Sequence, residues 1–487
     1  MRPYGDRTAA GPGTTPPLAA RVHPRPLIAT LLLAAFLLLP SMASVGMFFD
    51  GAIYASVSRN LADGIGSPWA PHFSDGLFPV FREHPPLVFW LQAMFFRALG
   101  DSYLTERAYD LTVVLLSAWL LWLLWRRLAH ASGSDGLVRY YWLPMLMWVV
   151  GPVWSWAYRN NLLENTMTLL CLAAALLVFD ALRTRIGRGW APALVAGAFT
   201  LAAFLAKGPT ALFVLVCPLL FGPALRVPVR RTAAVAAIHW ATATALFGAL
   251  IALVPEARET LAASWARQVG ARAGLDFEGL AILLELAKKL APMVLVVGAL
   301  AIAARDRARA ALHPVRRPAA ALLATGAAAS MPLVLGDLDS AHYLVPALPF
   351  YALGFGLAGA ALLDAVGPRT RARLSASPGT GFTLLSALAA LAIVLMSAGR
   401  IGEPRKNVAY HELFSHVSGM TGRGATLGLD PALYSDWTLH AVAQRHYRLS
   451  LDPEATGSPW RLVPALSGPP PGFEERVLEH GEWVLWR

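Results

Sequence analysis

The sequence predicts an all-α polytopic membrane protein of about eleven transmembrane helices, with a small C-terminal extracytoplasmic α/β appendage. Of its 487 residues, 56% are hydrophobic and only 15% are charged, whereas a soluble protein carries about 25% charged residues. Apolar runs long enough to cross a bilayer recur from Pro26 to Gly399. Beyond Arg400 the hydrophobic content falls, and short segments bounded by Gly and Pro begin.

The charge of the chain is concentrated in its loops. The net charge of +11 is best explained by arginines that gather between the apolar runs on one side of the membrane, so we expect no nucleic-acid partner. The two cysteines, Cys171 and Cys217, both lie inside apolar runs. We expect them to be small packing residues, with neither a disulfide framework nor a metal site.

Three regions are predicted. Residues 1–25 lack periodicity and are expected to form a disordered cytoplasmic tail, residues 26–399 form the membrane domain, and residues 400–487 form the appendage. The run Pro26–Phe49 is too long for a signal-peptide core, which predicts a retained first span. Ten further spans are predicted, at about 105–125, 140–158, 163–182, 190–206, 209–225, 233–254, 281–304, 319–336, 343–364 and 380–399.

Loop charges predict the orientation of these spans. Alternate loops carry clusters of arginine, and the positive-inside rule places them in the cytoplasm together with the N-terminus. The clusters are Arg126/Arg127/Arg139, Arg183/Arg185/Arg188, Arg226/Arg230/Arg231, Arg305/Arg307/Arg309/Arg316/Arg317 and Arg369/Arg371/Arg373. The loop 50–99 and the appendage then face the periplasm. Residues 256–289 mix charged and apolar positions, which predicts an outer loop and an amphipathic interfacial helix.

Short elements are predicted outside the spans. Within the loop 50–99, a helix over Gly51–Ala62 is expected along the membrane surface with Asp50 as its N-cap, and a second helix over Pro86–Leu99 begins at a proline. In the appendage, alternating apolar residues predict strands at 426–430, 446–451 and 460–465, a helix near 431–445 and a hairpin over 476–487.

Polar residues of the loop 50–99 are candidates for a site, because charges at a membrane face are costly to desolvate. Asp50 and Tyr54 are four residues apart and would share one face of a helix, where Asp50 is either a cap alone or also a general base. Arg82, Glu83 and His84 precede Pro85-Pro86, and prolines hold the preceding chain extended. This run is either a catalytic element or a charged loop entering a helix.

Further polar residues lie at the outer ends of spans. Lys207 precedes Gly208-Pro209 and either snorkels to the interface or binds a phosphate. Glu164 begins a span, where it would cap the helix, pair with a cation or orient a substrate. His342 and Tyr343 follow two acids, Asp337 and Asp339. The acids with His342 form either a metal site or, as the residues alone favour, a solvated loop.

Together these motifs resemble the bacterial members of the protein mannosyltransferase and aminoarabinose transferase group of the GT-C glycosyltransferases. The resemblance covers roughly residues 26–365 and lies in the order of the motifs at the span boundaries. The motifs are Asp50 with Tyr54, the E-x-P-P-L-x-x-W-L run from Glu83, Arg107, Glu164, Lys207-Gly208 and Tyr343-Leu-Val-Pro346. This sequence departs from the family at His84, where the family often has Lys, and the identity of the sugar stays open.

The resemblance implies a transferase that uses a sugar on a polyprenyl phosphate at the extracytoplasmic face, here the periplasmic face of a bacterial inner membrane. We expect Asp50 to act as the base in an in-line displacement with inversion. The acceptor would be a lipid, a glycan or a protein. Asp50 corresponds to the catalytic carboxylate, and Glu83 to an acid that either binds the sugar or acceptor or contributes to a divalent-metal position. Lys207 corresponds to the lysine that faces the lipid phosphate, with Arg82, His84 or Arg107 in support.

Two other functions are open to a multi-pass membrane protein of this composition. A flippase or transporter of lipid-linked sugars would carry polar residues near the centre of the membrane, whereas the charged residues of this chain gather at the outer boundary. That distribution favours chemistry at the surface. An O-antigen ligase or polymerase uses the same type of donor, and the sequence does not distinguish it from a transferase of a single sugar.

Overall fold

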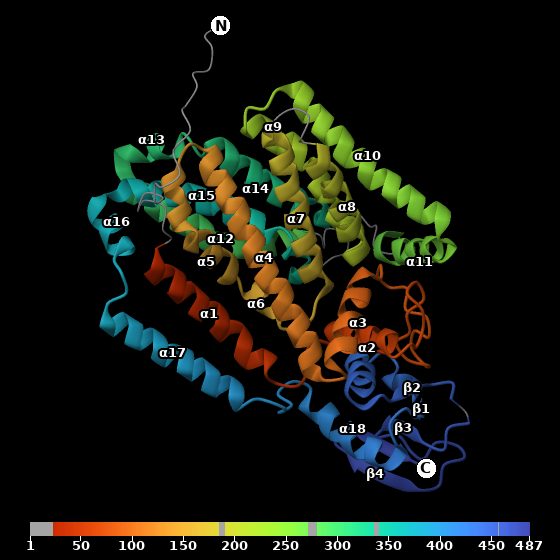
Figure 1. Ribbon diagram of the computed structural model, residues 1–487. Helices are drawn as coiled ribbons and strands as arrows, with labels where there is room; N and C mark the ends of the chain where they lie inside the picture. Colours follow the sequence, from red (N-terminus) through yellow and green to blue (C-terminus); the bar gives the residue numbers. More distant parts are fainter. Residues whose placement is uncertain (1–22, 185–189, 271–279, 336–339, 456) are drawn as a thin grey trace.

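A helical bundle with a small domain at one end forms the protein in a computed structural model that describes residues 23–184, 190–270, 280–335, 340–455 and 457–487 (Figure 1). Within these ranges eight helices are long and apolar enough to cross a membrane. They are α1 (Pro24–Met42), α4 (Tyr103–Ala131), α7 (Leu163–Arg183), α8 (Trp190–Lys207), α10 (Val229–Leu253), α12 (Leu280–Ala304), α15 (Leu348–Val366) and α17 (Thr380–Ala398). Most of the N-terminal tail predicted over 1–25 lies outside the described residues.

The other three predicted spans are each broken into two pieces. They are α5 (Trp142–Val149) with α6 (Pro152–Tyr158), η3 (Pro209–Val216) with α9 (Cys217–Ala224), and α14 (Arg316–Ser330) with η7 (Met331–Leu335). A proline lies at or next to each break, and proline cannot donate the backbone hydrogen bond that would continue a helix. The predicted span 343–364 likewise begins late, because η8 (Ala341–Leu344) and Pro346 precede α15.

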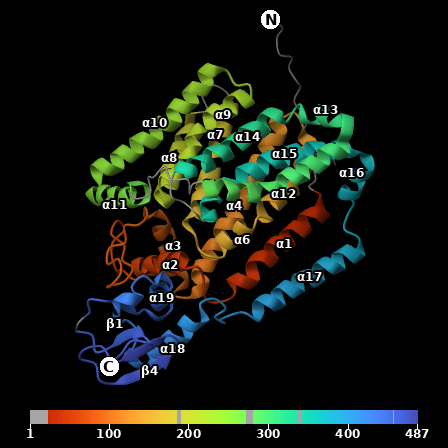
Figure 2. The same cartoon turned by 180° about the vertical axis from the view of Figure 1, so that it is seen from behind.

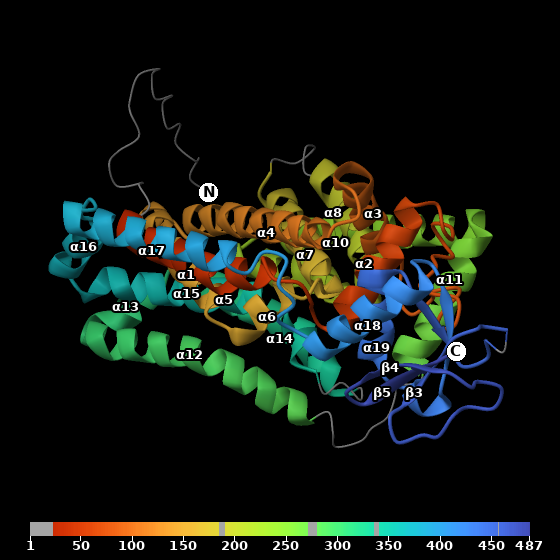
Figure 3. The same cartoon turned by 90° about the horizontal axis from the view of Figure 1, so that it is seen from below.

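The bundle has two ends of different character (Figure 1). One end carries α9, α13 (Ala308–Leu312) and α16 (Pro368–Ser375), and the C-terminal domain lies at the opposite end beside α2 (Phe49–Ala62) and α3 (Leu87–Leu99). The reverse view places the same domain beneath α2 and α3 (Figure 2). At the edge of the bundle, α17 packs along α1 and then leads into this domain (Figure 3).

The first helix after α1 corrects two expectations. Asp50 is not the N-cap of α2, because the helix begins at Phe49 with Phe48 in the capping position and Asp50 in the first turn. The backbone N–H of Phe48 is instead satisfied by Oδ1 of Asn160, at 2.7 Å. Helix α2 also does not lie along an open surface, since most of it is buried beneath α3 and the C-terminal domain.

The C-terminal domain is a five-stranded sheet with helices. Its strands run in the order β2-β1-β3-β5-β4, with β2, β1 and β3 parallel and the β3-β5-β4 part antiparallel. They are β1 (Thr426–Leu429), β2 (Ser450–Asp452), β3 (Arg461–Pro464), β4 (Arg476–His480) and β5 (Trp483–Trp486). The predicted C-terminal hairpin is confirmed. The predicted strand 446–451 starts only at Ser450, because Ala443–Tyr447 continues the helix α19 (Trp437–Val442) as η10.

One helix of this domain was missed by the sequence reasoning. Helix α18 (Val408–Thr421) follows α17 and buries Leu413, Phe414 and Val417 against the sheet. An outer loop and an interfacial helix were expected within 256–289. In the structure α11 (Pro255–Trp265) forms the beginning of that stretch, and α12 already starts at Leu280. Residues 271–279 are outside the described part of the chain.

Candidate active site

A cavity of about 260 Å³ opens between the N-terminal end of α2, the loop before α3, and the ends of α8 and η8. Six of the residues singled out from the sequence line it together, although they come from three distant parts of the chain. They are Asp50, Tyr54, Glu83, His84, Lys207 and Tyr343. Phe49, Ile53, Phe78, Phe81, Gln268 and Trp437 complete the lining. The cavity therefore combines acids, a lysine and a histidine with aromatic walls.

Asp50 reaches this cavity because α2 approaches its neighbour unusually closely. A Cβ atom on Gly51 would lie only 1.9 Å from the backbone oxygen of Asn160, so no larger residue fits there without moving the helix. Asn161 also donates a hydrogen bond to the oxygen of Gly51, at 3.0 Å. The backbone of the first turn of α2, which carries Asp50, is thus held by contacts with Asn160 and Asn161.

Tyr54 and His84 form a polar pair in the wall of the cavity. The hydroxyl of Tyr54 lies 3.1 Å from Nε2 of His84, and both side chains are buried. Tyr54 is one helical turn after Asp50, so α2 presents the carboxylate and the phenol on one face, as the four-residue spacing predicted. The run before Pro85-Pro86 brings His84 to this face from the other side.

Glu83 is held by the end of α11 and by the segment that follows it. Its carboxylate pairs with the Arg267 guanidinium, and its backbone oxygen accepts hydrogen bonds from Ser264 Oγ at 3.4 Å and Gln268 Nε2 at 3.1 Å. Next to it, Arg82 turns away from the cavity and pairs with Glu259 at 3.0 Å. Arg82 was expected near the donor phosphate, whereas the structure places it in this outer ion pair.

Lys207 forms a buried ion pair at the end of α8. Its Nζ lies 2.9 Å from Oε1 of Glu164, and the two side chains are only 5% and 1% exposed. Nε2 of His342 is 3.7 Å from the same oxygen, and the Lys207 ammonium lies 5.4 Å from the centre of the Tyr343 ring. Helix α8 ends at Lys207 because Gly208 adopts a φ of +100° before Pro209, which favours glycine.

Glu164 and His342 therefore lie behind the cavity rather than in its wall, where they position Lys207. Arg107 also lies outside the cavity. It is buried and donates hydrogen bonds to the backbone oxygens of Arg159 and Gly46, the latter at 2.9 Å. Arg107 thus joins the segment before α2 to the segment after α6, and its predicted contact with a phosphate stays a prediction.

Six lining residues were not singled out from the sequence, among them Phe78, Gln268 and Trp437. Phe78 and Gln268 belong to segments without a recognisable pattern, and Trp437 belongs to the C-terminal domain. Trp437 is the first residue of α19, whose N-terminus is capped by the Asp436 side chain. The sequence predicts a capped helix at this position, but nothing in it indicates that the helix contacts a cavity of the membrane domain.

The described residues do not fit a divalent metal. Across the ranges that the structure covers, no group of three or more His, Cys, Asp or Glu side chains is arranged to hold an ion. Divalent cations such as Ca²⁺ take six or more oxygen ligands, whereas the Glu83 carboxylate already faces a guanidinium. Asp337 and Asp339 lie outside the described residues.

Similar structures share this arrangement of helices. ArnT from Cupriavidus metallidurans bound to undecaprenyl phosphate matches with a TM-score of 0.59 and 14% identity, over 94% of this chain and 97% of that chain. The chain has an ArnT-like GT-C fold. The apo form of the same ArnT matches equally well, at 15% identity over 94% and 96% of the two chains.

A more distant likeness extends the comparison. The Archaeoglobus fulgidus oligosaccharyltransferase, solved with Zn and sulfate, matches with a TM-score of 0.52 and 16% identity, over 88% of this chain and 62% of that one. In sequence, the profile of the dolichyl-phosphate-mannose-protein mannosyltransferases matches residues 83–258. No curated protein matches the chain by sequence. These findings confirm the resemblance inferred from the motifs and the predicted fold class.

Proposed function

We propose that this protein transfers a sugar from a polyprenyl-phosphate donor to a lipid, glycan or protein acceptor, with inversion, at the periplasmic face of a bacterial inner membrane. The observation that supports it is the cavity in which Asp50 and Lys207 meet, within a fold shared with an ArnT that binds undecaprenyl phosphate. A carboxylate and an ammonium facing one small space supply the two charges that such a transfer needs.

Asp50 acts as the general base in this proposal. The acceptor hydroxyl gives its proton to the Asp50 carboxylate as its oxygen forms a bond to the anomeric carbon. The bond between that carbon and the phosphate oxygen breaks on the opposite side, and the phosphate leaves with the electron pair. In-line displacement of this kind inverts the anomeric configuration, and the proton passes from Asp50 to water.

Lys207 stabilises the departing phosphate. An ammonium has three N–H donors, and the pair with Glu164 uses one of them at the back of the cavity. The remaining donors are available to phosphate oxygens as negative charge develops there. Glu164, His342 and Tyr343 hold the ammonium in place, so the positive charge is already positioned before the reaction begins.

Tyr54, His84 and Glu83 shape the space between these two charges. The Tyr54–His84 pair offers hydrogen-bonding groups for sugar hydroxyls. Glu83 joins the cavity wall to Arg267, which places a second cation next to the site.

A comparison of cells with and without the gene tests this function. Mass spectrometry should show that cells without it accumulate a polyprenyl-phosphate sugar and lose the same sugar from one class of surface lipid, glycan or protein. A plasmid copy of the gene should restore both pools. If neither pool changes between the two strains, the proposed transfer does not take place.

A further inference from the structure

The C-terminal domain contributes an aromatic ring to the cavity. Trp437, at the start of α19, lines the cavity together with Phe78 of the loop before α3. The two rings are stacked, with centroids 5.9 Å apart and an interplanar angle of 15°. Trp437 remains 39% exposed, which leaves part of its ring open to a ligand.

Phe78 is held in an uncommon backbone conformation at this contact. Its φ is +53°, a region that a bulky residue with a Cβ atom rarely adopts. Phe81 meets its ring edge-on at 5.6 Å, and the Arg267 guanidinium lies 5.8 Å from the ring centre. The surrounding side chains thus fix Phe78 as a support for Trp437, and strained residues of this kind are concentrated at ligand sites.

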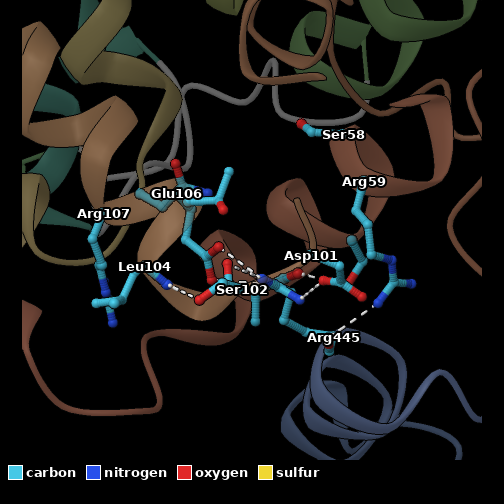
Figure 4. Close-up of polar contacts among 12 residues, drawn as sticks. Ser58, Arg59, Asp101, Ser102, Leu104, Glu106, Arg107 and Arg445 are labelled. Carbon is cyan, nitrogen blue, oxygen red and sulfur yellow. Dashed lines mark hydrogen bonds and ion pairs between the residues drawn. The ribbon is translucent and has the colours of Figure 1, made fainter. Parts of the chain in front are cut away.

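The domain that carries Trp437 is locked to the membrane domain (Figure 4). Arg445, in η10 just after α19, donates to Oδ1 of Asp101 at 2.9 Å and to Oε2 of Glu106 at 2.8 Å, at the start of α4. From α2, Arg59 donates to the backbone oxygens of Gln444 and Arg445. The Arg445 side chain is only 3% exposed. Trp437 is therefore a fixed part of the cavity wall.

We propose that Trp437, supported by Phe78, is the platform on which a sugar ring stacks in this cavity. A sugar ring presents C–H groups on its faces, and these pack against the electron-rich face of an aromatic ring. The two aromatic rings are too close to admit a sugar between them, which would need about 7 Å for two van der Waals contacts. The sugar therefore packs on the open side of Trp437, in the space that Asp50 and Lys207 also face.

This inference deepens the proposed function and rests on it, because the stacked ring belongs to either the donor or the acceptor. The first measurement is made on purified protein incubated with the polyprenyl lipid fraction of cells that lack the gene. Mass spectrometry then gives the ratio of retained polyprenyl-phosphate sugar to retained sugar-free polyprenyl phosphate. The second measurement is the KM for each substrate in the transfer of the same donor to membranes of those cells.

The variants are Trp437→Ala, Trp437→Phe and, as a control, Tyr434→Ala, an exposed aromatic of the same domain that does not line the cavity. If the donor sugar stacks, Trp437→Ala lowers the retention ratio by about three- to tenfold. If the acceptor sugar stacks, the ratio is unchanged and the KM for acceptor rises instead. Trp437→Phe keeps an aromatic face, so its retention ratio and KM values should stay close to those of the wild type. Tyr434→Ala should match the wild type in both measurements.

Two other outcomes separate the failures. If the folded Trp437→Ala protein matches the wild type in the retention ratio and in both KM values, the stacking role is wrong while the proposed function stands. If the wild-type protein retains no polyprenyl-phosphate sugar and transfers none, the proposed function itself is wrong, and the stacking role falls with it.

Discussion

The Lys207–Glu164 pair shows how much a residue's environment changes its interpretation. From the sequence, Lys207 was either a snorkelling side chain or a ligand for phosphate. The structure buries it against Glu164, with 5% and 1% of the side chains exposed, which does not fit a lysine that reaches for the interface. A buried ion pair fixes the ammonium at one wall of the cavity, where it serves as a positioned charge.

Replacing Lys207 should separate its structural role from its binding role. Lys207→Ala leaves the buried Glu164 charge uncompensated, which should cost about 3–5 kcal/mol of stability. Lys207→Met combined with Glu164→Gln removes both charges and should recover the melting temperature. Its affinity for undecaprenyl phosphate should still be weaker by roughly 1.5–3 kcal/mol.

Lys207→Arg should restore transfer only in part, because the planar guanidinium imposes a different geometry from an ammonium. Isothermal titration measures the affinity of each variant for undecaprenyl phosphate, and a thermal melt measures its stability. Wild-type binding and turnover in the double variant would make the pair purely structural, and the phosphate site would then have to be sought elsewhere in the cavity.

Glu83 gives a prediction about metal ions. Because its carboxylate faces Arg267 and the described residues offer no cluster of ligands, the transfer rate of the purified protein should be the same with and without EDTA. Glu83→Gln should reduce the rate by loosening the contact with the segment after α11. A loss of activity in EDTA that added Mg²⁺ or Mn²⁺ restores would contradict this prediction and make Glu83 a metal ligand.

At the scale of elements, the sequence predicted the helices and strands that depend on neighbouring residues alone. Most apolar runs are spans, the helix after Pro86 begins where expected, and the C-terminal hairpin forms over 476–487. Breaks within three spans were missed, because hydropathy does not register a proline that interrupts the hydrogen bonding of a helix. The capping of α2 was also missed, because the acceptor, Asn160, is more than a hundred residues away.

The same limit applies to the candidate site. Asp50 and Tyr54 could be predicted to share one face from their spacing on a helix. Glu83 and His84 could be predicted to lie in the site because two prolines follow them. Trp437 could not be predicted, because its approach to the cavity depends on how the C-terminal domain docks. That docking uses Arg445, whose partners lie more than three hundred residues earlier.

Docking of the C-terminal domain should depend on Arg445 and on pH. Arg445→Ala removes the guanidinium that pairs with the buried Glu106 carboxylate, and this should weaken docking by about 3–5 kcal/mol. Arg448→Ala is the matched control, since Arg448 pairs with Asp63 and Asp101 but is 33% exposed, and should cost at most about 1 kcal/mol. Limited proteolysis of the chain after α17, in liposomes, measures the release of the domain.

The pH dependence follows from Asp101. Burial alone would raise its pKa, but the charge of Arg445 and the hydrogen bond from Arg448 outweigh burial and hold the pKa of Asp101 below its usual range. A lowered pKa stabilises docking above the usual aspartate pKa of about 4, and this stability is lost as the pH falls further. Proteolytic release with an acid-active protease should therefore increase below about pH 4. Release that does not change with acid would contradict the role of this cluster.

At the scale of the whole molecule, one end of the bundle carries short helices with arginines. The short helices α13 and α16, with their arginines, lie at the end away from the candidate active site (Figure 1). The positive-inside rule assigns that end to the cytoplasm. An alkaline phosphatase fused after Arg400 should then be active, and one fused after Arg309 should be inactive. The reverse pattern would show that the orientation is wrong.

We propose that the cavity around Asp50 carries out sugar transfer, and one measurement tests this proposal most directly. It is the rate of transfer by purified protein in liposomes, with the donor isolated from cells that lack the gene. Asp50→Asn should lower this rate by about 10²–10⁴-fold and leave the melting temperature and the affinity for undecaprenyl phosphate unchanged. Asp75→Asn, in the same loop but outside the cavity, should stay within about twofold of the wild type. Near-normal transfer by Asp50→Asn would contradict the account, because the carboxylate would then not be the base.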